Sequence, residues 1–346
     1  MRLWKSKTSR QNIITLLGMA VVLSLFLVLD GNGLLKRSLS GQLVPICVYI
    51  IMALSLNLTV GIMGELSLGH AGFMSIGAFS GVIAVASLGN FIGSPVLLMI
   101  IAVLIGGILA GIMGFLIGIP VLRLRGDYLA IVTLAFGEII KNIINCLYVS
   151  LDGTKLQFAM FSGAKLTGNF IINGPQGAAI TNRLSTFGFG AALVMVSLIL
   201  IMNIVHSKEG RAIKAIRDNA IAAESVGLNI TAVKMKAFVI SAVFAGMAGV
   251  LFAMNYSVIE AKKFNFNTSI NVLVMVVLGG MGSIRGSIIA AIVLTVLPEL
   301  LRGFDDFRML IYALILILVM ILNSNSRFKQ FKLNISNKLK WKGATK

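Results

Sequence analysis

The sequence predicts an all-α, polytopic integral membrane protein, and three observations indicate this class. Of the 346 residues, 58% are hydrophobic and 12% are charged, whereas soluble domains carry about 25% charged residues. Apolar runs of roughly 20 residues, the length that crosses about 30 Å of hydrocarbon, recur along the chain. Basic residues gather at the two ends and in the segments between these runs, as the positive-inside rule expects.

About ten apolar segments are predicted to span the membrane, and the ninth is short. They lie near residues 13–29, 44–62, 68–88, 96–119, 128–149, 187–205, 237–258, 268–284, 287–301 and 308–322. The eighth and ninth are separated at the turn 279–286, with Arg285 at its cytoplasmic face. One long span over 268–301 would place the basic tail on the opposite side from the other basic segments.

The first span resembles a secretory signal peptide, because a basic start precedes an apolar run. No small-x-small cleavage site follows cleanly and further spans do, so this run is interpreted as a retained span. Cys47 and Cys146 lie inside apolar segments and are interpreted as small buried residues, so no disulfide or metal framework is expected.

Charge predicts that both termini are cytoplasmic. The transmembrane domain is predicted to cover residues 13–322. Four basic segments are predicted to lie on its cytoplasmic side: the N-terminus 1–12, the turn with Arg123 and Arg125, the segment 206–236 and the tail 323–346. The segment 150–186, rich in Gly, Asn and Thr, falls outside. The tail holds seven basic residues and no acidic one from Arg327 on, so the net charge of +18 indicates anionic lipid headgroups rather than nucleic acid.

Three glycine clusters lie in the apolar segments, at 61–72, 106–118 and 279–283. Every backbone polar group inside a bilayer must find a partner, so such clusters need a reason. The middle cluster is interpreted as close helix packing. The outer two combine glycine with polar residues, and helix breaks beside a water-filled route are a hypothesis for both.

Two polar sites lie within the apolar segments. Glu138 lies about 15 Å into the fifth span, and Lys141 lies one helical turn further on the same face. The two form either a structural ion pair or part of the lining of a polar route. His70, with Glu65 flanking Ser67 in the first glycine cluster, is interpreted as a hydrogen-bonded packing residue rather than a catalytic one.

The polar segment 206–236 predicts an amphipathic helix between two spans. Gly227 is expected to end this helix, and Asn229 or Thr231 to cap the next one. Three interpretations remain open: a helix docked on a partner, a helix lying flat on the membrane, or a plain connector. Small and apolar residues recur at a spacing of three and four on one face; they are Ile213, Ile216, Ala220, Ala223 and Gly227.

Enzyme motifs are absent from the sequence. It contains no Gly-x-Ser-x-Gly, no His-Glu-x-x-His and no acidic cluster for a metal, so an enzyme is not expected. It also contains no Gly-x4-Gly-Lys-Ser/Thr phosphate-binding loop. If ATP powers transport here, a partner chain binds it, and no cofactor is expected in this chain.

The chain resembles the permeases of branched-chain amino-acid ABC importers, LivM type, over nearly all of residues 40–322. Four stretches carry the resemblance: LNLTVGIMGELSLGHAGFMSIGAFS (56–80), GDYLAIVTLAFGEIIKNII (126–144), GRAIKAIRDNAIAAESVGLNITAVKMKAFVISAVFAGMAGVLFA (210–253) and SINVLVMVVLGGMGSIRG (269–286). Each stretch alone is weak, whereas all four in this order are specific. The segment 173–177 is similar to the Gly-Gly-Pro-x-Gly of the family.

The resemblance implies a multi-pass cell-membrane subunit that forms the translocation path of an importer for branched-chain amino acids. The implied partners are cytoplasmic ABC ATPase subunits, a second, related permease and an extracytoplasmic binding protein. The coupling motif Glu-Ala-Ala-x3-Gly of ABC importers matches at Ala222, Ala223 and Gly227. Ile221 takes the Glu position and the downstream Ile-x-Leu-Pro is absent, which puts in doubt a Glu contact but not the docking helix.

Two sets of candidate site residues follow. Those expected to couple to the ATPase are Arg211, Arg217, Asp218, Ala222, Ala223, Glu224 and Gly227. Those expected to approach the substrate route are Ser67, Gly69, His70, Glu138, Gly280, Gly282 and Ser283.

Other functions also fit parts of the sequence. Related permeases carry urea, short amides or other amino acids, and nothing local selects Leu, Ile or Val over these. A different class is an ion- or proton-coupled secondary transporter that works without an ATPase, with Glu138 as the coupling carboxylate. A channel or scaffold without energy coupling is disfavoured by the helix in 210–227.

Overall fold

The computed structural model describes residues 7–33, 37–89, 91–124, 126–152, 155–161, 166, 168–180 and 183–301, with a few further positions up to 317. The chain divides into two units, 1–292 and 293–346. The contacts below belong to the first unit, and the last helix, α12 (Ile284–Leu300), runs across the boundary. Most of the predicted tenth span and all of the basic tail lie outside the described residues.

Within the described residues, six helices are long and apolar enough to cross a membrane. They match the first four, the sixth and the seventh predicted spans. In chain order they are α1 (Lys7–Gly31), α3 (Leu43–Leu56) with its π-helical continuation η1 (Asn57–Met63), α4 (His70–Leu88), α5 (Pro95–Val121), α7 (Phe187–His206) and α10 (Ile230–Ala253). A short helix, α2 (Arg37–Ser40), precedes α3.

The predicted boundaries of the seventh span are wrong at both ends. Helix α10 begins at Ile230 rather than 237 and ends at Ala253 rather than 258. Its start is fixed by Asn229, whose Oδ1 accepts a hydrogen bond from the Ala232 amide at 3.0 Å, as the capping prediction required. Lys234 therefore belongs to the first turns of this helix and not to the preceding connector.

The eighth and ninth predicted spans form two separate helices. Helix α11 (Phe266–Gly279) ends where the turn was predicted, and α12 begins at Ile284. Gly280 and Gly282 take positive φ angles of 90° and 81° in the turn between them, which glycine adopts without steric cost. Arg285, predicted to lie in the turn, lies in the first turn of α12.

The all-α prediction is wrong for the segment after the fifth span. Helix α6 (Asp127–Asn145) ends before the predicted boundary at 149, and the chain continues as strand β1 (Leu147–Asp152). Four more strands complete an antiparallel sheet in the order β2-β1-β3-β4-β5. They are β2 (Lys155–Met160), β3 (Asn169–Asn173), β4 (Ala178–Ala179) and β5 (Val258–Ile259).

The sequence gives a physical reason for this difference. The apolar residues of β1 continue the hydropathy of α6, so a run over 128–149 has the composition of one span. Pairing of β1 with both β2 and β3, for example Val149 with Phe158 and with Ile172, satisfies the strand instead. Two 3-10 turns, η2 (Gly174–Gln176) and η3 (Ala261–Lys263), border the sheet residues.

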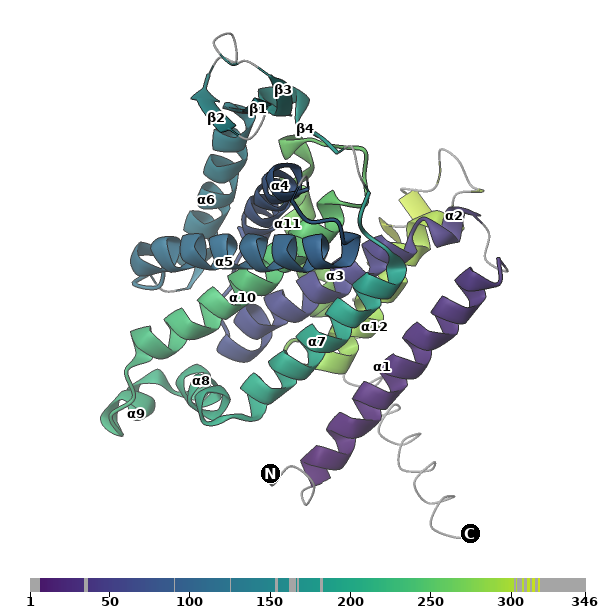
Figure 1. Ribbon diagram of the computed structural model, residues 1–346. Helices are drawn as coiled ribbons and strands as arrows, with labels where there is room; N and C mark the ends of the chain where they lie inside the picture. The colour runs from purple at the N-terminus through teal and green to yellow at the C-terminus, as the bar shows by residue number, and fades with distance from the viewer. Residues whose placement is uncertain are drawn as a thin grey trace. The chain divides into compact units, whose positions relative to one another are not determined.

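Helices α4, α5 and α10 pack against one another through glycines (Figure 1). A Cβ atom placed on Gly246 would lie 2.4 Å from the Cβ of Ala110, and one on Gly77 would lie 2.1 Å from the carbonyl oxygen of Gly246. Such contacts require small residues because the helix backbones themselves touch. The interpretation of the 106–118 cluster as close helix packing is confirmed.

The predicted single helix in 206–236 is two helices, α8 (Lys208–Asp218) and α9 (Ala220–Ser225). The chain is extended at Asn219, with φ −156° and ψ 102°, and the Asn219 side chain caps α9 by accepting from the Ala222 amide at 3.0 Å. Gly227 has a φ of 84° just after α9, so the predicted glycine terminus is confirmed.

Three of the five residues of the apolar stripe are buried within the chain itself, and Ala220 and Gly227 are exposed. Ile213, Ile216 and Ala223 are each at most 4% exposed, and α8 packs on α7, α10 and η1. The buried part of the stripe is therefore used within the chain, and docking of this segment on a partner stays a prediction. These residues hold α8 and α9 against the bundle, because burying apolar side chains is favourable.

The described segments sort to two ends of the bundle. Helices α8 and α9 precede the start of α10 and the sheet strand β5 follows its end, and the 24 residues of α10 span about 36 Å. Helix α6 begins at Asp127 and ends at the sheet. A Cβ on Gly188, at the start of α7, would lie 3.8 Å from Leu27, at the end of α1, so α1 begins near the α8 end. Figure 1 shows the sheet at the top and α8 and α9 at the lower left.

Replacing Gly77 tests the glycine packing. We expect Gly77→Ala to lower the thermal unfolding midpoint of the detergent-solubilised chain, because its Cβ would overlap the Gly246 carbonyl oxygen and overpacking costs about 1–3 kcal/mol. The matched control is Gly18→Ala in α1, whose added Cβ meets nothing within 4 Å. Equal midpoints for the two variants would contradict the close packing.

Candidate functional site

The candidate site is organised by a break in the second spanning helix. Helix α3 passes into the π-helical η1, all of whose residues are buried, and helical geometry stops at Gly64, which has a φ of 80°. The chain is irregular from Gly64 to Gly69, and α4 starts at His70. Irregular backbone in a membrane protein needs partners from the protein itself or from water. We call residues 57–69 the break segment.

The break segment meets the α11–α12 turn directly. The amide of Gly282 donates to Asn57 Oδ1 at 2.9 Å. A Cβ on Gly61 would lie 2.2 Å from the Gly282 nitrogen, so the two glycine clusters are in backbone contact. At both clusters one helix ends and the next begins, and the structure adds that the two connections form one junction. The prediction that this junction lines a water-filled route stays a prediction.

Arg217 of α8 reaches the same junction. Its Nη1 donates to the carbonyl oxygen of Gly61 at 3.0 Å, and its Nε and Nη2 donate to Asp218 Oδ1 at 3.2 and 3.0 Å. Arg217 is one of the residues expected at the surface that couples to the ATPase. Its guanidinium joins that surface to the break, a contact between residues 156 positions apart that no spacing rule predicts.

Two ion pairs hold α8 and α10 beside the break. Lys234 Nζ pairs with Glu65 in the break segment, and both side chains are less than one-fifth exposed. Lys236 pairs with Glu209 of α8 at 2.7 Å, and both of these side chains are about half exposed. The buried Lys234–Glu65 pair is the stronger constraint, because solvent screens an exposed pair. Sequence reasoning missed both pairs because it assigned the two lysines to a loop.

His70 lies at the buried centre of the site. The His70 side chain is fully buried, with Nε2 2.9 Å from Ser55 Oγ and 3.2 Å from Ser241 Oγ. The hydroxyl of Ser241 donates to the Ser55 carbonyl at 2.6 Å, and the His70 ring meets the edge of Phe73 with centroids 6.0 Å apart. These contacts confirm the interpretation of His70 as a hydrogen-bonded packing residue that ties α3, α4 and α10 together.

Three buried polar atoms have no hydrogen-bond partner among the described residues. Asn57 Nδ2 and Ser67 Oγ belong to the break segment, and His70 Nδ1 belongs to the residue that follows it. Gly69 is packed so closely that a Cβ would lie 2.2 Å from the Thr133 carbonyl oxygen. The break segment therefore carries polar capacity that the described protein atoms leave unused.

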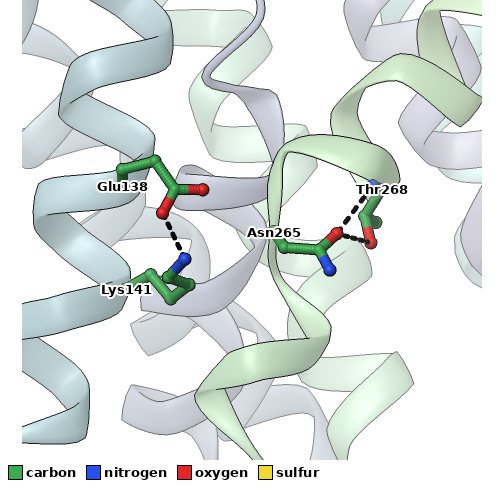
Figure 2. A network of polar contacts seen from close by, with 4 residues as sticks. All are labelled: Glu138, Lys141, Asn265 and Thr268. Carbon is green, nitrogen blue, oxygen red and sulfur yellow. Dashed lines mark hydrogen bonds and ion pairs between the residues drawn. The ribbon is translucent and has the colours of Figure 1, made fainter.

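Glu138 and Lys141 form the predicted ion pair on α6. Figure 2 shows the pair facing the start of α11, where Asn265 Oδ1 accepts from the Thr268 amide at 3.1 Å. Glu138 also borders a small cavity of about 10 Å³, room for about one water molecule. Its lining includes Leu68 of the break segment and Gly72 of α4. Phe264, just before α11, and Ser269 of α11 also line it.

Side chains satisfy the backbone on both sides of this cavity. The Leu68 amide donates to Thr133 Oγ1 at 3.0 Å, and the Ala71 amide donates to Ser269 Oγ at 3.1 Å. The cavity thus separates α6 from α11, with the entry to α4 between them. Glu138 does not join the Gly61–Gly282 junction, so the predicted route residues fall in two places linked by the break segment.

Gly280 and Ser283 accompany Gly282 in the α11–α12 turn. Gly282 and Ser283 are exposed and Gly280 is half-buried. Ser283 Oγ accepts from the Gly286 amide at 3.2 Å, which caps the start of α12.

The predicted coupling residues lie on α8, on α9 and just after it, but with unequal exposure. Ala222, Glu224 and Gly227 are exposed and Ala223 is buried, while Arg211 donates to the His206 carbonyl at 3.3 Å. Two residues that sequence reasoning did not select carry the exposed apolar surface: Ile221 is 82% exposed and Val226 is 77% exposed. The sequence held one indication of this apolar surface, since Ile221 takes the Glu position of the coupling motif.

Among the described residues, no three or more His, Cys, Asp or Glu side chains lie close enough together to hold a metal ion.

Comparisons with known proteins identify the family. The family model described as the permease component of the branched-chain amino acid transport system matches residues 38–322. The permease LivM of the high-affinity branched-chain amino acid transport system of Escherichia coli is 37% identical over 308 residues, covering 79% of this chain and 66% of that protein. This chain therefore spans a little less than two thirds of the length of that relative.

Two further relatives are more distant. LivH of Salmonella typhimurium, also a permease protein of a high-affinity branched-chain amino acid transport system, is 27% identical, with 79% of this chain and 88% of that protein covered. A probable LivM of Methanocaldococcus jannaschii is 24% identical, covering 73% of this chain and 78% of that protein. No solved structure matches. With a family match over most of its length, and helices long and apolar enough to cross a membrane, the chain belongs to the family of branched-chain amino acid transport permease components.

Proposed function

We propose that the chain is a transmembrane permease subunit of an ATP-driven importer for the branched-chain amino acids Leu, Ile and Val. The observation that carries the proposal is the α8–α9 unit. It is anchored on the bundle by Ile213 and Ile216, presents Ile221 and Val226 to solvent, and contacts the helix break through Arg217. A surface that is rigidly seated, apolar at its tip and joined to a break suits transmission of force from a partner.

The proposed partners follow from the same family and surface. Two cytoplasmic ABC ATPases bind below, a second and related permease completes the translocation path, and an extracytoplasmic protein delivers the substrate. ATP is bound by the ATPase chains, and no cofactor is assigned to this chain. The resemblance of this chain to both LivM and LivH supports pairing of two related permeases.

The proposed topology has about ten spans with both termini in the cytoplasm. The start of α1, the start of α6 and α8–α9 share one end of the bundle, and the strands lie at the other. Basic residues concentrate at the first end, which the positive-inside rule assigns to the cytoplasm. The sheet is then extracytoplasmic.

The proposed substrate route runs from the Gly61–Gly282 junction to the Glu138–Lys141 pair. Its candidate lining residues are Ser67, Gly69, His70, Glu138, Gly280, Gly282 and Ser283. Unpartnered polar atoms at Ser67 and His70 suit a polar cargo, and the neighbouring opposite charges of Glu138 and Lys141 match the ammonium and carboxylate of a zwitterion. Urea or short amides carry no net charge at either end and would use the same hydrogen-bonding groups.

The α8–α9 tip can be tested with Ile221→Asp combined with Val226→Asp. We expect the ATPase subunits to co-purify at least about tenfold less, because each lost apolar contact is worth about 1.5 kcal/mol or more. The matched control is Lys208→Asp, which places a charge change at the exposed start of the same unit. Undiminished co-purification would show that the docking surface lies elsewhere.

A secondary transporter would show no ATPase partner in the wild type, and its uptake would stop with a protonophore while ATP remains.

Sidedness can be tested in a chain whose Cys47 and Cys146 are replaced by alanine. We expect Lys155→Cys on β2 to react with a membrane-impermeant maleimide in intact cells, because the residue is exposed on the proposed outer sheet. Ser225→Cys on α9, also exposed, should react only after permeabilisation. The reverse pattern would place α8–α9 outside and remove the ATPase partnership.

The route can be tested with the paired variant Glu138→Gln, Lys141→Gln. The variant removes both charges together and so avoids an unpaired charge near the midplane. We expect normal membrane insertion and assembly, with uptake reduced about tenfold, equivalent to about 1.4 kcal/mol. Normal uptake in this variant would leave the pair a purely structural role.

A further inference from the structure

The end of η1 leaves the Gly61 carbonyl group without its regular helical partner. In an α-helix the Gly61 carbonyl would accept from the amide four residues on, that of Glu65. The Glu65 amide instead donates to the Thr59 carbonyl at 3.1 Å. The Gly61 carbonyl accepts from Arg217 Nη1 at 3.0 Å. A guanidinium from α8 thus takes the place of a backbone donor at the end of η1.

Glycines make room for the arginine. A Cβ on Gly64 would lie 2.7 Å from Arg217 Cγ, so the aliphatic stem passes directly over that residue. The Cβ position of Gly282 is 3.9 Å from Arg217 Nη1 and 3.1 Å from the Gly61 carbonyl oxygen. The tip of the arginine therefore contacts Gly61 and lies beside Gly282, where the two segments meet.

Asp218 fixes the other side of the guanidinium. Its Oδ1 accepts from both Nε and Nη2, which leaves Nη1 aimed at Gly61. Asp218 is the last residue of α8, and α9 starts two residues later, after the extended Asn219. Any displacement of α9 acts on the short stretch 217–219 and hence on the guanidinium.

We propose that Arg217 is the positioning residue that couples α8–α9 to the Gly61–Gly282 junction. The inference rests on the proposed function, in which an ATPase grips α8–α9. When the grip moves α9, the guanidinium carries the displacement to the Gly61 carbonyl and shifts the two broken helices together. The charge-assisted bond is directional and joins a solvent-facing element to a buried backbone, which a neutral packing contact would do less rigidly.

A purely structural role makes a different prediction. If Arg217 only stabilised the fold, its loss would lower assembly, ATP hydrolysis and uptake in proportion. If it transmits movement, its loss separates hydrolysis from uptake. The discriminating quantity is the amount of substrate imported per ATP hydrolysed by the assembled transporter.

The experiment reconstitutes the full complex, with both permeases, the ATPases and the leucine-loaded binding protein, into proteoliposomes. For Arg217→Ala we expect ATPase co-purification and hydrolysis within about twofold of wild type, and leucine import per ATP reduced about tenfold, within the usual range of coupling between sites. Arg217→Lys, which keeps one charged donor but loses the fork to Asp218, should recover part of the ratio. Lys208→Ala, at the far end of α8, should leave the ratio unchanged.

Several outcomes would overturn the inference. A wild-type import per ATP in Arg217→Ala, or a proportional fall in all three quantities, removes the coupling role. If Arg217→Ala does not assemble, Arg217→Met carries the test, because it keeps an aliphatic stem over Gly64 but has no donor for the Gly61 carbonyl. A wild-type ratio in Arg217→Met would also overturn the inference. Absence of an ATPase from the wild-type complex would instead contradict the proposed function, so the two failures are distinguishable.

Discussion

The rest of the structure depends on the satisfaction of backbone polar groups where the second spanning helix breaks. Lipid offers no hydrogen-bond partner, so an irregular segment is stable only if the protein supplies partners. Here Arg217 of α8 and Thr133 of α6 supply them, and Asn57 of the segment in turn accepts from the Gly282 amide of the α11–α12 turn. The helices converge on this segment because their side chains replace the missing helical bonds.

Close backbone contact joins the break segment to the α11–α12 turn. Gly61 and Gly282 touch without intervening side chains, and packed cores change between discrete arrangements more readily than they deform continuously. In the proposed importer, the junction is the point that receives movement and the Glu138 region is the point that meets the cargo.

The α8–α9 unit combines two requirements that a single amphipathic stripe cannot meet. One apolar face, with Ile213 and Ile216, is used up in seating the unit on the bundle. Docking then needs a second apolar surface, and the extended Asn219 provides it by reorienting α9 relative to α8. Ile221 and Val226 are consequently exposed while Ala223 on the same short helix is buried.

The sequence by itself determined the membrane class, the approximate positions of six spans, the helix ends at the outer two glycine clusters, a cap at Asn229 or Thr231 and the Glu138–Lys141 pair. These features depend on composition or on neighbours within about four residues, which local rules describe. The tertiary structure decided the sheet after α6, the division of α8 from α9 and the burial of the stripe. It also decided the Arg217–Gly61 and Lys234–Glu65 contacts. Each of these joins segments distant in sequence or depends on which face a neighbouring helix covers, and periodicity carries no information about either.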